Sequence, residues 1–113
     1  MKLIKAYIRH RKFAEVYHTL KSEGFCCMTI VDCEGTGKYA DHEMEHISAK
    51  YPFADAYRVV KIEILATDED TLTIISLIRE KGRTGYMGDG MILVSHVEEA
   101  YKVRTNEQGF TSI

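Results

Sequence analysis

Two features of the sequence predict an α+β fold in which two helices cover one face of an antiparallel sheet. Apolar segments of strand length occur at residues 2–9, 25–33, 57–66 and 91–94. Segments of helical period separate the first strand from the second and the third from the fourth. Two right-handed crossovers would then place both helices on the same side of the sheet. This order, βαββαβ, is that of the ferredoxin-like plait.

The first half of the chain contains the first crossover. Residues 2–9 are rich in Leu, Ile and Tyr, which favours a strand. A helix is predicted next, because apolar residues recur at i, i+3, i+4 and i+7: Phe13, Val16, Tyr17 and Leu20. Gly24 lies where a left-handed helix stop is expected. In the second strand, at 25–33, the adjacent Cys26 and Cys27 would point to opposite faces and pack there.

The third strand, at 57–66, carries Val60, Ile62 and Ile64 on one face. The sheet face away from the helices must be buried against something, and we expect these three side chains to lie on that face. They are too apolar to face water, so the sequence predicts an oligomer.

The second crossover follows this strand. Thr67 or Asp68 is expected to cap the second helix, which ends at Gly82. This helix turns Ile74, Leu77 and Ile78 inward. Residues 97–104 are expected to add one helical turn and a short edge strand after the last strand of the plait.

Composition narrows the function classes. The 113 residues form a single domain, and the net charge of -2 argues against general nucleic-acid binding. No segment resembles a signal peptide, and no apolar run approaches the ~18 residues that insert into a bilayer. Three cysteines, an odd number, do not suit a disulfide framework. We therefore expect a cytoplasmic protein.

Two segments stand out as candidate functional loops. Residues 36–56 separate two strands that a hairpin would join with far fewer residues, and such long loops are usually functional. Residues 84–90, Thr-Gly-Tyr-Met-Gly-Asp-Gly, follow the second helix. Three glycines allow a ligand to approach the backbone and allow successive N–H groups to face an anion. The alternative is an ordinary glycine-rich turn between helix and strand.

Residues 83–94 (RTGYMGDGMILV) resemble the B-loop signature of the nitrogen-regulatory P-II signal-transduction family. Residues 35–38 (GTGK) are similar to the start of that family's T-loop, and 102–105 (KVRT) are similar to its C-loop. The resemblance covers nearly the whole chain and fails mainly between residues 39 and 58. It makes 1–113 a divergent P-II-like domain with its T-loop at 36–56, its B-loop at 83–90 and its C-loop at 102–109.

The resemblance implies a non-enzymatic regulator of nitrogen metabolism. It would be a homotrimer that binds ATP or ADP, with AMP as an alternative, in the clefts between subunits. Its T-loop would dock on a membrane transporter, a channel or a metabolic enzyme. The nucleotide contacts carried over are Thr29, Gly35, Gly37, Lys38, Thr84, Gly85, Gly88, Asp89, Gly90, Lys102 and Arg104. The B-loop residues would cradle the phosphates, and the two C-loop cations would neutralise them.

The chain departs from the family at several positions. Met91 stands where the family has a basic residue, which predicts weaker ATP binding or a shift towards ADP or AMP. The positions that help to hold 2-oxoglutarate fall on Tyr39 and Val59, with Arg58 as a substitute if the register slips by one. These departures weigh against the binding of 2-oxoglutarate and magnesium. Tyr51 aligns with a tyrosine that some members modify, although an unmodified exposed tyrosine is the simpler interpretation.

Residues 42–46, His-Glu-Met-Glu-His, match the zinc-protease pattern His-Glu-x-x-His. We reject a protease, because the match lies in the T-loop segment and lacks a third ligand on a following helix. Metal binding without catalysis would use Cys33, His42 and His46. The alternative function is therefore a metal- or small-anion-responsive P-II-like protein with a weakened nucleotide site. A small enzyme on the same plait is disfavoured, because no other catalytic constellation is visible.

Overall fold

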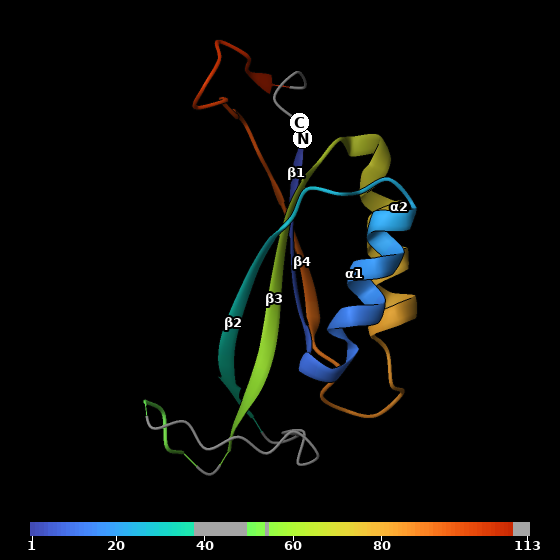
Figure 1. Cartoon of the computed structure of the whole chain (residues 1–113), viewed down its shortest axis with the longest axis vertical. Helices are drawn as coiled ribbons and strands as arrows, with labels where there is room; N and C mark the ends of the chain where they lie inside the picture. The colour runs from blue at the N-terminus through green and yellow to red at the C-terminus, as the bar shows by residue number, and fades with distance from the viewer. Residues whose placement is uncertain (38–49, 54, 110–113) are drawn as a thin grey trace.

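The computed structural model describes residues 1–37, 50–53 and 55–109. Within these ranges the strands form an antiparallel sheet with the spatial order β2-β3-β1-β4. Both helices lie on one face of that sheet (Figure 1). This is the ferredoxin-like plait, and the predicted fold class is confirmed. The elements are β1 (Lys2–Arg9), a 3-10 turn η1 (His10–Lys12), α1 (Phe13–Ser22), β2 (Thr29–Thr36), β3 (Ala56–Ala66), α2 (Asp68–Gly82) and β4 (Met91–His96).

The position of β1 brings distant segments together at one end of the sheet. β1 is a central strand, and its last residue, Arg9, lies opposite Val59 of β3. On its other side, Tyr7 pairs with Met91, the first residue of β4. β2 ends with Thr36 opposite β3 at the same end. The B-loop and the start of the T-loop therefore enter the sheet close to each other.

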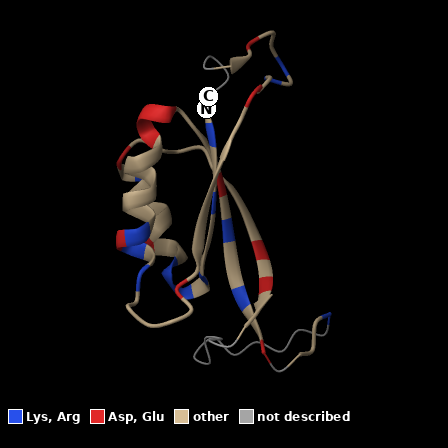
Figure 2. Cartoon of the chain, turned by 180° about the vertical axis from the view of Figure 1, so that it is seen from behind, with Lys and Arg blue, Asp and Glu red and all other residues tan. Residues whose placement is uncertain are grey.

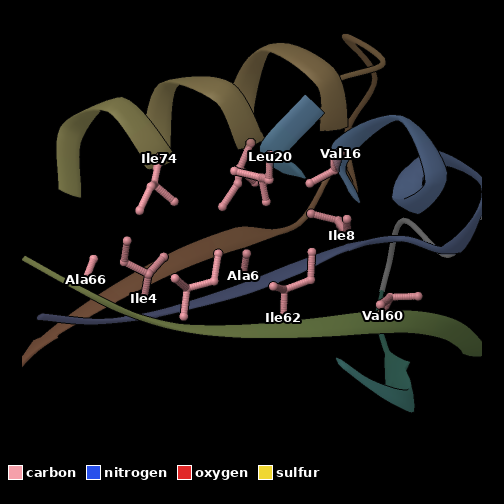
Figure 3. Packing of buried hydrophobic residues seen from close by; sticks show 11 residues of the cluster. Ile4, Ala6, Ile8, Val16, Leu20, Val60, Ile62, Ala66 and Ile74 are labelled. Atoms are coloured by element: carbon pink, nitrogen blue, oxygen red, sulfur yellow. The ribbon is translucent and has the colours of Figure 1, made fainter. Parts of the chain in front are cut away.

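The core lies between the helices and one face of the sheet (Figure 3). Side chains from β1 and β3 meet side chains from α1 and α2 there. Burial of each fully buried Ile or Leu contributes about 2 kcal/mol to folding. The most deeply buried large side chains are Ile4, Val16, Leu20, Val60, Ile62, Ile74 and Ile78.

The structure corrects the placement of Val60, Ile62 and Ile64. All three belong to the core beneath the helices and are at most 4% exposed, so they do not cover the open face. Strand alternation fixes which residues share a face, but it does not say which face the helices will cover. The prediction that Val60, Ile62 and Ile64 would be buried between subunits was therefore wrong.

The open face of the sheet is mixed in character. Lys61 and Glu63 lie there, and the Lys61 Nζ is 3.2 Å from Glu63 Oε1. Figure 2 views the chain from behind and shows basic and acidic residues along these strands. Val31 and Leu93 share this face and are 37% and 44% exposed. Apolar side chains exposed on an uncovered sheet still predict an oligomer. The residues that it would bury are Val31 and Leu93.

The helix boundaries agree with the sequence signals. The Thr67 side chain accepts a hydrogen bond from the Asp70 N–H at 3.2 Å and so caps α2, which ends at Gly82 as predicted. Gly24 has φ +93° after α1, which confirms the left-handed stop. Neither described helix has the length and apolar character needed to cross a membrane.

The second strand begins later than predicted. The Phe25 N–H donates to Leu20 O at 2.9 Å and so completes the end of α1, which leaves Phe25 unable to start a strand. β2 therefore begins at Thr29, and Cys26 and Cys27 lie before it. Both cysteines are exposed, and their Sγ atoms are 3.0 Å apart. The prediction that they pack on opposite faces of a strand was wrong.

The segment after β4 also differs from the prediction. β4 extends to His96, and residues 97–104 contain no helical turn. The Val97 N–H instead donates to Met1 O at 3.1 Å, which continues the contact with the start of β1. The predicted short edge pairing is reduced to an isolated bridge between Tyr101 and Gln108.

Candidate functional site

A hollow of about 520 Å³ lies at the end of the open sheet face where the B-loop meets β2. This volume is within the ~300–1,000 Å³ range of small-molecule sites. It brings together four of the predicted contacts: Gly35, Gly88, Asp89 and Gly90. Its other described lining residues are Tyr7, Cys33, Glu34, Tyr57, Val59, Lys61 and Met91.

Asp89 organises the B-loop from inside. Its carboxylate accepts hydrogen bonds from the N–H groups of Thr84 and Gly85, both at 2.9 Å, and from the Thr84 hydroxyl. The Tyr86 N–H in turn donates to the Thr84 hydroxyl at 3.2 Å. An anionic side chain therefore already occupies two backbone donors of this loop. In this arrangement Asp89 shapes the loop, since a carboxylate repels a phosphate.

Arg9, which was not among the predicted site residues, attaches this loop to the sheet. Arg9 is 6% exposed at the end of β1. Its Nε donates to Asp89 Oδ1 at 2.9 Å, and its Nη2 donates to Met87 O at 2.8 Å. A charged residue that closes an apolar strand was the available signal, because a buried guanidinium needs a partner.

The environment of Asp89 favours its charged form. Burial raises the pKa of Asp89, but hydrogen bonds from Thr84, Arg9 and the Gly85 and Thr84 backbone outweigh it and hold that pKa well below its usual range. The carboxylate therefore stays ionised at every physiological pH. Titration of Asp89 therefore does not alter the B-loop near neutral pH.

Gly90 lies so close to the backbone of β1 that there is no room for a side chain. It has φ +102°, and a Cβ added there would lie 1.8 Å from Tyr7 O. Gly85 and Gly88 also have positive φ, at +92° and +95°. At Gly90, therefore, both the backbone angle and the neighbouring strand exclude a side chain.

The start of the T-loop lies beside an aromatic side chain. A Cβ on Gly35 would be 3.3 Å from Tyr57 Cζ and 3.3 Å from Val59 Cγ2. A Cβ on Gly37 would be 3.9 Å from Tyr57 Cε1. Tyr57 therefore covers the two glycines. We define the B-loop group as Gly35, Gly37, Thr84, Gly85, Gly88, Asp89 and Gly90.

The remaining described contacts, Thr29, Lys102 and Arg104, lie at the opposite end of the molecule, and we call them the C-loop group. Thr29 is six positions before Gly35 on β2, which corresponds to about 20 Å along a strand. The segment with Lys102 and Arg104 also lies at that end, away from the B-loop (Figure 1). Both cations are exposed. One chain therefore does not bring its predicted contacts into one site.

Cys27 is close to the C-loop group. Its pKa is raised, first by the hydrogen bond and charge of Cys26 and then by burial, while the charges of Lys102 and Lys21 act in the opposite direction. Lys102 thus lies near the loop that precedes Thr29.

The remaining predicted site residues are Lys38, Tyr51 and the candidate metal ligands Cys33, His42 and His46. Lys38, His42 and His46 lie outside the described residues. Cys33 lines the hollow and donates from Sγ to Val59 O at 3.3 Å, and burial raises its pKa. Within the described ranges, no three His, Cys, Asp or Glu side chains are grouped to hold a metal ion. Tyr51 is 45% exposed, with the Lys50 ammonium 5.4 Å from its ring centroid.

Two comparisons place the chain among known proteins. The model of the family "Nitrogen regulatory protein P-II" matches residues 1–107. The nitrogen regulatory protein P-II of Rhizobium meliloti is 36% identical over 113 residues, which cover 100% of both chains. That of Bradyrhizobium diazoefficiens is 37% identical over the same full lengths. The nitrogen fixation nifHD region GlnB-like protein 1 of Methanothermobacter marburgensis is 38% identical over 109 residues, 96% of this chain and 99% of its own.

Proposed function

The chain belongs to the nitrogen regulatory protein P-II family, and we propose that it binds an adenine nucleotide in the clefts of a homotrimer. Occupancy of these clefts controls a partner protein through the T-loop. The protein is a cytoplasmic signalling component and catalyses no reaction. The partner is a membrane transporter, a channel or a metabolic enzyme.

The separation of the two groups of contacts is the observation that carries this proposal. The B-loop group lies at one end of the plait and the C-loop group at the other (Figure 1). A nucleotide is too short to reach both groups of one chain. A neighbouring copy that presents its C-loop end to the B-loop end of the first copy would complete the site.

The charge of the hollow also supports a site shared with a second chain. Lys61 is the basic side chain among the described lining residues, and it is paired with Glu63. The same lining includes Glu34 and Asp89. A polyphosphate needs more positive charge than this to balance its own. Lys102 and Arg104 of a neighbouring copy would supply it, while Tyr7 and Tyr57 offer aromatic surface to a base.

Met91 sets the expected preference among nucleotides. It is 63% exposed, lines the hollow and follows Gly90 directly. A thioether contributes no charge towards the outermost phosphate. ADP or AMP therefore loses less than ATP from this substitution, and we propose a preference for the shorter nucleotides.

The position of Gly35 and Gly37 suggests how binding reaches a partner. Both glycines open the T-loop, and Gly35 lines the hollow. A ligand that contacts them in one loop conformation increases the population of that conformation. The T-loop would then dock on its partner in one nucleotide state and be released in another.

Calorimetric titration of the purified protein with ATP, ADP and AMP, each with and without 2-oxoglutarate and magnesium, is the first test. The proposal expects binding to at least one nucleotide. Failure of all three to bind would remove the proposed function and direct attention to the metal-responsive alternative.

A subunit-complementation experiment tests the shared cleft. Gly88→Ala impairs the B-loop group, and Arg104→Ala impairs the C-loop group, so each variant alone should bind nucleotide at least about tenfold more weakly than wild type. Any mixed trimer of the two contains one cleft with both groups intact. Co-expressed, doubly tagged trimers should therefore regain one site per trimer. Mixed trimers that stay inactive would contradict a shared cleft, and Arg11→Ala, which removes an exposed arginine of η1 outside both groups, is the charge-matched control.

A further inference from the structure

The adjacent Cys26 and Cys27 occupy an unusual position between α1 and β2. They follow the last hydrogen bond of the helix end, from the Phe25 N–H to Leu20 O, and precede the first β2 ladder pair at Thr29. Regular secondary structure therefore does not hold their backbone. Both thiols are exposed, and their Sγ atoms approach to 3.0 Å.

The two thiols are accessible to a small reagent. Cys26 and Cys27 line a surface hollow of about 240 Å³ together with Gly24, Phe25 and Leu65. The flanking Gly24 has φ +93° and no atom within 4 Å of a Cβ placed on it, so the loop has room to adjust. The pKa of Cys27 is raised, first by its hydrogen bond with Cys26 and by the charge of Cys26, while the positive charges of Lys102 and Lys21 act in the opposite direction.

We propose that Cys26 and Cys27 form a reversible dithiol–disulfide site that undergoes thiol–disulfide exchange with small organic disulfides. The convergence of two exposed sulfur atoms carries this assignment. Side chains placed for packing would be buried, and adjacent residues of a strand would point apart. Here they point towards each other.

The exchange proceeds in two steps. The Cys26 thiolate attacks one sulfur of the organic disulfide, forms a mixed disulfide and releases one small thiolate. Cys27 then loses its proton to that thiolate and attacks the Cys26 sulfur. The Cys26–Cys27 bond forms as the second small thiolate leaves and takes up a proton. The two protein thiols are oxidised by two electrons, and the organic disulfide is reduced to two thiols.

The product is a labile disulfide. Adjacent Cα atoms lie ~3.8 Å apart, which is below the usual ~4.4–6.8 Å of disulfide-linked residues. Such strain makes a disulfide easier to reduce, so small thiols restore the dithiol. The pair therefore does not stabilise the fold and instead responds to the thiol–disulfide balance of its surroundings.

Mass spectrometry of the intact protein incubated with oxidised glutathione tests the proposal. Wild type should lose two hydrogen atoms without retaining glutathione, and dithiothreitol should reverse the change. Cys26→Ser and Cys27→Ser each lack the resolving partner and should retain glutathione as a mixed disulfide. Cys33→Ser is the matched control for thiol number, because it removes the thiol outside the pair and should lose the same two hydrogen atoms on oxidation as wild type.

A second reagent keeps the test independent of oxidation. Phenylarsine oxide condenses with two neighbouring thiols and releases water. Wild type and Cys33→Ser should each gain one adduct per chain, and Cys26→Ser should gain none. A glutathione adduct that persists in wild type, a disulfide between two chains, or no arsenical adduct would each overturn the proposal.

Discussion

The two ends of the plait differ in how firmly the chain itself fixes them. At the B-loop end, Asp89 accepts bonds from Thr84, Gly85 and Arg9, and Gly90 lies against the backbone of Tyr7. At the C-loop end, Lys102 and Arg104 are exposed at the surface. The B-loop end therefore has a preformed shape but little positive charge. The C-loop end carries positive charge on exposed side chains. Mutations of the residues that fix the B-loop, Asp89 and Gly90, should act on stability, and mutations of the exposed cations at the C-loop end should act on binding alone.

Gly90→Ala should give the largest effect at the B-loop end. The added Cβ would meet Tyr7 O at 1.8 Å, and the φ of +102° is itself unfavourable for alanine. Relief of the clash must separate the start of β4 from β1. The expected loss is about 3–4 kcal/mol in the free energy of unfolding, measured by urea denaturation.

Gly85→Ala is the matched control for that substitution. Gly85 belongs to the same loop and has φ +92°, but a Cβ there would have no atom within 4 Å. It should cost about 1 kcal/mol from the backbone angle alone. Equal losses in the two variants would show that the approach to Tyr7 is not what requires Gly90.

Asp89→Asn should destabilise the protein by about 2–3 kcal/mol at neutral pH, because it removes charge-assisted bonds from a buried arginine. The pKa of Asp89 in the folded state is depressed. Its stabilisation is therefore complete above the ordinary aspartate pKa of about 3.9 and is lost as pH falls further, towards the depressed value. The difference between wild type and variant should stay constant from pH 7 to about 5 and shrink below about 4.

Asp32→Asn serves as the control for the pH series. The Asp32 carboxylate is 72% exposed, with Arg58 Nη2 at 3.7 Å, so the substitution should change stability by no more than about 0.5 kcal/mol. A difference between wild type and Asp89→Asn that grew on acidification would contradict the ionised form assigned to Asp89.

Arg104→Ala tests the other side of the comparison. An exposed side chain outside the core should leave the unfolding free energy within about 0.5 kcal/mol of wild type. Loss of one charge-assisted contact to phosphate should weaken nucleotide binding about tenfold or more. Calorimetry and urea denaturation on the same preparation would separate the two effects. A fall in stability equal to that of Asp89→Asn would show that the two ends do not differ in this way.

The sequence predicted the elements well because local chemistry sets them. Thr67 caps α2 and Gly24 ends α1 through their immediate neighbours, as expected. The prediction failed where tertiary structure decides. No local sequence feature indicates which face of β3 the helices cover. Val60, Ile62 and Ile64 were therefore assigned to the wrong face. Phe25 was read as strand because its apolar character concealed its bond to the end of α1.

The candidate site also contains residues that the sequence could identify and one that it could not. The resemblance to the P-II family named the glycines of the B-loop, and the structure gathers Gly88 and Gly90 beside Gly35. It did not identify Arg9, whose partners are about 80 positions away in the chain and come close only when β1 and β4 pair. The charge at the end of an apolar strand indicates that Arg9 needs a partner, but a contact this distant in the sequence leaves no local pattern that identifies the partner.

Met91→Lys should give the smallest effect and would sharpen the comparison from the B-loop end. The side chain is 63% exposed, so the substitution should hardly change stability. It adds one positive charge to the rim of the hollow, which should tighten ATP binding about threefold to tenfold and ADP binding less. Met87→Lys is the control, because Met87 is 68% exposed in the same loop but does not line the hollow. If both lysines tighten ATP and ADP equally, the gain comes from general electrostatic attraction, and Met91 does not set the preference among nucleotides.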